Sequence, residues 1–182
     1  FESAGLSGVL ALRGDPIGGP TAPWTATPGG MTYAEELVEL ASSTSLEVGI
    51  AAFPDVHPAS HGNFMHDIQV LLRKEQKGAT YAITQFVFDS GRFEALRDAL
   101  QARGSHLRLY PGIMPVTNKS QVQRMAELSG AAFPGWLADK LANVDDPDEV
   151  RRIGVDAATE LCAELLSAGA PGLHFYTLNR ST

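Results

Sequence analysis

Short, continuously apolar runs are the feature that most constrains the fold of this chain. They occupy residues 9–12, 46–53, 79–88, 107–114 and 172–178. None of them alternates regularly between apolar and polar side chains, which is typical of parallel strands covered by helices on both faces. The first run breaks into Arg13, Gly14, Asp15 and Pro16, so polar groups gather where a predicted strand ends.

Helical patterns separate these runs. Apolar stripes predict helices over residues 33–41 and 64–77, a third helix that ends at Gly104, and a fourth that begins after Asp146 and closes at Gly169. The last is the clearest, because an Asp cap, a proline and a glutamate three residues after the cap open it. Alternating strands and helices favour right-handed βαβ units and a parallel α/β sheet, whose functional site lies at the carboxyl ends of the strands.

Those ends supply a set of polar side chains. Gln85 lies inside an apolar run, where an amide is costly to bury unless it is hydrogen-bonded. Thr117 and Asn118 form a plausible cap for a helix that carries Gln121 and Met125. The complete set of predicted strand-end residues is Arg13, Asp15, Asp55, His57, Gln85, Asn118, Gln121 and Arg180.

Composition excludes several classes of protein. The 182 residues, 44% of them hydrophobic, fit a single domain over residues 1–182, and the net charge of −7 disfavours nucleic-acid binding. No apolar run is long enough to span a membrane. Cys162 is the only cysteine, so an intramolecular disulfide is impossible, and its apolar neighbours in a helical pattern favour a buried spectator thiol. A reducing cytoplasm is the expected location. We predict no metal site, because Pro58 and Gly62 argue against a helix holding His57 and His61 on one face.

Five ordered motifs resemble the methylenetetrahydrofolate reductase family. They are residues 11–16 (ALRGDP), 51–58 (AAFPDVHP), 83–89 (ITQFVFD), 111–116 (PGIMPV) and 174–180 (HFYTLNR). The resemblance covers essentially the whole chain. It implies a TIM (β/α)8 barrel, of which this chain looks like strands four to eight, with the N-terminal strands and the last helix expected to be missing.

The resemblance also implies an activity. The family uses FAD to pass a hydride from NADH or NADPH to 5,10-methylenetetrahydrofolate, in a ping-pong sequence that gives 5-methyltetrahydrofolate; NADH is expected here, and so is a homo-oligomer. The family's acidic proton donor is expected on the missing strands. Two alternatives stay open: a partial barrel that serves only as a non-catalytic binding or assembly module, and an unrelated TIM-barrel enzyme.

Residue roles follow from the motif matches for the flavin. Asp15 is the predicted catalytic carboxylate beside the flavin, although an Asp that closes a turn ahead of Pro16 is the simpler interpretation. The matched positions that contact the flavin ring are Arg13, Gly14, Ala34 and Phe53, the last in place of a Tyr in many members. The matched positions that hold the ribose, adenine and pyrophosphate are His57, Asp67, Arg73 and Lys74.

The substrate positions follow in the same way. Gln85 is predicted to contact the pterin and the nicotinamide in turn, with a core amide bonded to a neighbouring strand as its structural alternative. Gln121, Met125 and Arg180 match folate-contacting positions, and Met125 replaces an aromatic residue. The loop over residues 17–31 is either a lid or a disordered insertion.

Overall fold

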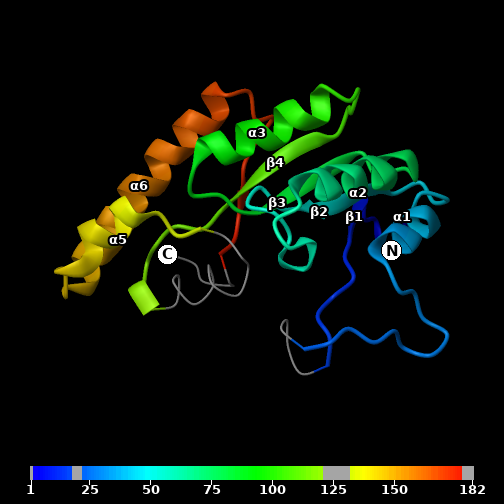
Figure 1. Cartoon of the computed structure of the whole chain (residues 1–182), viewed down its shortest axis with the longest axis horizontal. Coiled ribbons are helices and arrows are strands. Elements are labelled where there is room, and N and C mark those ends of the chain that lie inside the picture. Colours follow the sequence, from blue (N-terminus) through cyan, green and yellow to red (C-terminus); the bar gives the residue numbers. More distant parts are fainter. Residues whose placement is uncertain (1, 18–21, 121–131, 178–182) are drawn as a thin grey trace.

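The structure, a computed structural model, describes residues 2–17, 22–120 and 132–177. Within these ranges five parallel strands form one sheet in the order β1-β2-β3-β4-β5 (Figure 1). They are β1 (Gly8–Ala11), β2 (Glu47–Ala52), β3 (Tyr81–Phe86), β4 (Arg108–Ile113) and β5 (His174–Phe175). All five predicted strands are therefore confirmed. The predicted runs extend one or more residues beyond most strands.

Helices follow the strands and lie together on one side of the sheet (Figure 1). They are α1 (Ala34–Ala41), α2 (Phe64–Gln76), α3 (Ser90–Gln101), α5 (Gly135–Ala142) and α6 (Pro147–Ser167), with short 3-10 helices η1 (Glu2–Ala4) and η2 (Pro58–Ser60). The four predicted helices are confirmed, and α5 was not predicted. The helix expected to carry Gln121 and Met125 falls outside the described residues.

Helix α6 begins where the sequence indicates. The Asp146 carboxylate accepts a hydrogen bond from the Asp148 amide at 3.1 Å, and Pro147 occupies the first helical position. Glu149, predicted to complete a capping box, binds the Arg152 guanidinium at 2.6 Å. The Glu149 carboxylate, which was predicted to complete the capping box, thus forms an ion pair with Arg152 one turn along the helix.

The core lies between the helices and the sheet, and it corrects one expectation. Val48, Ile50 and Ala82 point toward the helices and are at most 1% exposed. Leu10 of β1 and Phe175 of β5 belong to the same sheet but are 39% and 50% exposed. Helices therefore cover one face only, not both, because the other face is the concave interior of a barrel wall.

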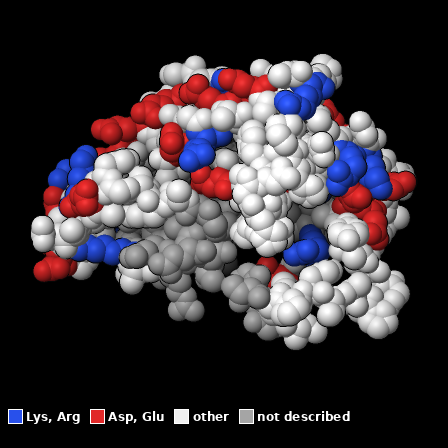
Figure 2. Space-filling model, in the orientation of Figure 1, with Lys and Arg blue, Asp and Glu red and all other residues white. Residues whose placement is uncertain are grey.

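The charged side chains follow this arrangement. Most of the acidic and basic side chains visible in Figure 2 lie along the rim formed by the helices, with both signs interspersed. Such a mixed surface is the ordinary solvated face of a helical layer. The excess of acidic residues is therefore spread over the rim and does not form one patch in this view.

A second cluster packs where β4 leaves the sheet. Phe86, Met114 and Val116 meet side chains of α5 and α6 there. Gly154 allows this packing, because a Cβ atom at this position would lie 1.8 Å from the Val116 carbonyl oxygen. The close approach of α6 to the end of β4 thus requires glycine at position 154.

Candidate active site at the carboxyl ends of the strands

The predicted site residues near β1 follow directly after the strand. Arg13, Gly14 and Asp15 form an exposed turn in which Gly14 has a φ of +77°, a conformation that favours glycine. The Arg13 guanidinium lies 4.6 Å from the centroid of the Trp24 ring, a cation–π contact with the long loop that follows. This contact was not predicted, since nothing in the sequence indicates which residue of the loop returns to β1.

The segment after β2 is held by a buried carboxylate. Asp67 of α2 is 8% exposed, and it accepts hydrogen bonds from the His57 amide at 2.6 Å and from the Ser60 hydroxyl. The edge of the His57 ring also meets the Phe53 ring, with centroids 4.5 Å apart. Asp67 therefore holds the His57 backbone, and Phe53 packs against the His57 ring.

The hydrogen bonding of His57 sets its proton position. Its Nδ1 accepts a hydrogen bond from the Ala59 amide at 3.0 Å, so in the neutral ring the proton lies on Nε2. Burial lowers the pKa of His57, the Asp67 carboxylate raises it, and the positive charges of Arg13 and Lys74 lower it further. The net effect favours a neutral imidazole with an N–H donor on Nε2.

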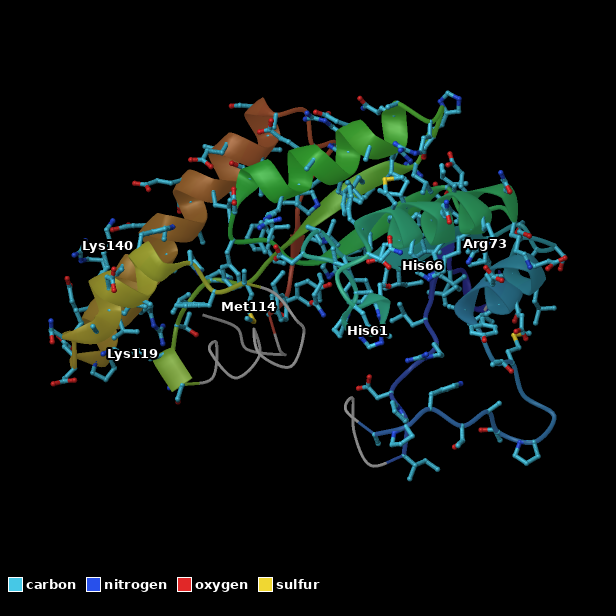
Figure 3. All side chains as sticks on the ribbon, in the orientation of Figure 1. His61, His66, Arg73, Met114, Lys119 and Lys140 are labelled. Atoms are coloured by element: carbon cyan, nitrogen blue, oxygen red, sulfur yellow. The ribbon has the colours of Figure 1, made fainter. Side chains whose placement is uncertain are left out.

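Lys74 lies in the same electrostatic environment. Burial lowers the pKa of Lys74, the Glu35 carboxylate raises it, and Arg73 and Arg13 lower it. Arg73 itself forms an ion pair with Glu35 at 3.3 Å. In Figure 3 Arg73 lies well along α2, whereas His61 precedes this helix and His66 lies near its start. We call Arg13, His57 and Lys74 the cation cluster; the positive charge of Arg13 disfavours the charged forms of His57 and Lys74, and an anion bound among them would favour those forms.

Gln85 lies near the end of β3 and is half-buried. Its Oε1 accepts a hydrogen bond from the Phe86 amide at 3.1 Å, within its own strand. The structural alternative for Gln85 was a core amide bonded to a neighbouring strand, whereas the partner of its Oε1 is on the same strand. An oxygen held in this way leaves the amide nitrogen as a directed donor.

Other predicted residues are placed less centrally or not at all. Ala34 is the first residue of α1 and is half-buried. Gln121, Met125 and Arg180 lie outside the described residues. Asp55, a strand-end residue without an assigned role, pairs with Arg92 at 3.5 Å and accepts a hydrogen bond from the Ala132 amide at 3.3 Å.

Burial raises the pKa of Asp55, the Ala132 amide and Arg92 lower it, and Asp89 raises it. Asp55 therefore connects the end of β2 to the start of α3 and to the segment before α5. In the sequence, this role of Asp55 was indicated only by its position in the second motif, residues 51–58.

Two further searches apply to the described part of the chain. No group of three or more His, Cys, Asp or Glu side chains there is placed to hold a metal ion. None of the helices found there combines the length and apolar character needed to cross a membrane.

The fold and the site together define the class of protein: a parallel β/α-barrel wall with a cation cluster and a directed amide at the carboxyl ends of its strands. Comparison with known proteins gives the particular family. The sequence profile of methylenetetrahydrofolate reductase matches residues 1–182, so the chain belongs to this family, whose fold is the TIM barrel.

Individual relatives agree. The chain is 34% identical to 5,10-methylenetetrahydrofolate reductase of Escherichia coli and 36% identical to that of Buchnera aphidicola, over 100% of this chain and 59% of each relative. Methylenetetrahydrofolate reductase 1 of Schizosaccharomyces pombe is 34% identical over 98% of this chain and 30% of its own length. The chain therefore spans about three fifths of the bacterial relatives.

A solved structure supports the fold. A Clostridium thermocellum protein, described as binding two copies of 5-methyl-5,6,7,8-tetrahydrofolic acid, superposes with a TM-score of 0.53 at 20% identity. The match covers 78% of this chain and 50% of that protein.

Proposed function

We propose that this chain forms the FAD- and folate-binding part of an enzyme that reduces 5,10-methylenetetrahydrofolate to 5-methyltetrahydrofolate with NADH or NADPH. The observation that carries the proposal is the electrostatic coupling of Arg13, which follows β1, with His57, which follows β2, and with Lys74 of α2. The names of the bacterial and yeast relatives support the reaction. The folate bound by the Clostridium thermocellum protein supports the substrate class.

The cation cluster fits the diphosphate of FAD. Burial and like charges disfavour the charged forms of His57 and Lys74, and two phosphate charges would restore them. Arg13 and Lys74 would supply charge-assisted hydrogen bonds, and so would the Nε2 proton of His57 once the bound phosphates favour its protonated form. When bound, FAD would accept a hydride from the nicotinamide and deliver it to the folate.

The side chains near the ring and the substrate have separate tasks. The exposed carboxylate of Asp15 would disfavour further negative charge close to it and favour a cationic form of the folate. The amide of Gln85 would donate to the pterin, and to the nicotinamide when that substrate occupies the same place. Asp15→Asn is therefore expected to slow folate reduction more than nicotinamide oxidation, as half-reactions followed separately by stopped flow would show.

The visible absorbance spectrum of the purified protein tests the proposal. Flavin bands that bleach on anaerobic addition of NADH, and return on addition of 5,10-methylenetetrahydrofolate, are the expected result. NADPH in place of NADH identifies the preferred donor. A colourless protein that takes up no added FAD would refute the proposal and leave the non-catalytic binding module as the better interpretation.

A further inference from the structure

Strand β3 is irregular at the residue assigned to substrate binding. Ile83 pairs with Tyr110 of β4, and the next pair joins Phe86 to Gly112. One strand advances three residues while its partner advances two, which is a β-bulge with one extra residue. Thr84 and Gln85 occupy the bulge. Bulges of this kind are enriched beside active sites, where they redirect a side chain.

The Thr84 hydroxyl takes the place of a missing ladder bond. Thr84 is 0% exposed, although it is polar. Its Oγ1 accepts a hydrogen bond from the Gly112 amide at 2.9 Å and donates one to the Gln85 carbonyl at 2.7 Å. The hydroxyl therefore joins β4 to the backbone of the residue that the bulge presents.

Tyr176, which follows β5, closes the bulge from the other side. Its hydroxyl donates a hydrogen bond to the Thr84 carbonyl at 2.9 Å, and its ring meets the Phe86 ring with centroids 4.8 Å apart. The ring lies over Gly112, where a Cβ atom would come within 2.6 Å of its Cε2. Groups from β3, β4 and the segment after β5 thus fix the backbone on both sides of the Thr84–Gln85 peptide.

We infer that Thr84 and Tyr176 are positioning residues whose hydrogen bonds hold the bulge and so direct the Gln85 amide toward the substrate. Side chains alternate between the two faces of a strand, so loss of the extra residue in the bulge would turn the side chains that follow it to the other face. Without these bonds Gln85 would lose its fixed direction. The inference rests on the proposed function only for the identity of the substrate; the control of the Gln85 direction is a property of the sheet.

Four variants test it. Thr84→Val keeps the shape and removes the hydroxyl, Thr84→Ser restores a hydroxyl, and Tyr176→Phe removes the second bond. Thr80→Val is the matched control, because the Thr80 hydroxyl binds Glu47 at the opposite end of β3. The expected structural result is faster hydrogen exchange of the Gly112 amide and shifted side-chain amide resonances of Gln85 in Thr84→Val. Thr84→Ser and Thr80→Val should leave both close to the native values.

The kinetic test uses a double-mutant cycle with Gln85→Ala. Loss of one buried hydrogen bond that acts through Gln85 is expected to lower kcat/KM for the folate by about tenfold in the native background. In the Gln85→Ala background the same Thr84→Val change should have almost no effect. Thr84→Ser should recover most of the activity.

The outcomes separate the two proposals. Unchanged Gly112 exchange and Gln85 resonances in Thr84→Val would overturn the inference, whatever the activity. An equal kinetic loss in both backgrounds would overturn it too, because Thr84 would then act on the fold and not through Gln85. If the native protein reduces no folate, the proposed function fails while the amide measurements still decide the inference. Tyr176→Phe supplies those measurements if Thr84→Val does not fold.

Discussion

Replacing Lys74 by methionine should weaken FAD binding and at the same time stabilise the protein without its ligand. The methionine keeps most of the apolar stem and removes the ammonium group. Burial and the neighbouring Arg13 and Arg73 charges lower the pKa of Lys74 despite Glu35 and Asp67, so the charged form is on balance disfavoured in the folded protein. A bound diphosphate reverses that balance.

The magnitude of the affinity loss follows from the bond that disappears. A hydrogen bond between an ammonium group and a phosphate contributes about 1.5–3 kcal/mol, so Kd for FAD should rise about 10- to 150-fold. Lys77→Met is the matched control on the same helix. Lys77 pairs with Glu39 at 2.9 Å on the outer surface, and its loss should leave the affinity for FAD unchanged.

The stability of the ligand-free protein should depend on pH in a defined direction. The folded pKa of Lys74 is below its ordinary value of 10.5, so the unfolded chain binds more protons between the two values. The free energy of unfolding therefore rises with pH across that window, and Lys74→Met should remove this part of the slope.

Fluorescence titration with FAD and urea unfolding at several pH values measure both effects. Lys74→Met binding FAD as tightly as Lys77→Met does would refute the assignment of the diphosphate to the cation cluster. A ligand-free Lys74→Met protein less stable than the native protein at neutral pH would refute the electrostatic argument.

Three other predictions concern the site and its support. Binding of FAD should raise the lowered pKa of His57, so the protein takes up protons on binding and its affinity for FAD rises as the pH falls toward the pKa of His57 in the ligand-free protein. Calorimetry in two buffers of different ionisation enthalpy measures the proton uptake, and zero uptake contradicts the argument. Asp67→Ala leaves two half-buried donors without their carboxylate partner and should lower the free energy of unfolding by about 2–3 kcal/mol, whereas a change below the error of urea unfolding would contradict its role in holding this segment. Gly154→Ala should destabilise by about 2–3 kcal/mol by overpacking, while Gly135→Ala, with open space around it, should be neutral or slightly stabilising; equal midpoints in urea would contradict the packing.

The sequence predicted the strands and most of the helices, because continuous apolar runs and helix caps are local signals. The bulge at Thr84 and Gln85 depends on the register with β4, which no local pattern encodes. For the same reason the contact of Arg13 with Trp24 and the support from Tyr176 became visible only in the structure. The motif matches predicted functional side chains, whereas the side chains that contact them became visible only in the coordinates.

The cation cluster and the bulge at Thr84 and Gln85 are prepared for their ligands in different ways. At the cation cluster, burial and neighbouring positive charges disfavour the charged forms of His57 and Lys74. A bound anion would stabilise those forms, and the ligand-free protein is less stable without it. At the bulge the Thr84 hydroxyl already bonds two backbone groups, so the direction of Gln85 exists before any substrate arrives. This difference supports the proposal that one cofactor stays bound while two substrates use the same place in turn.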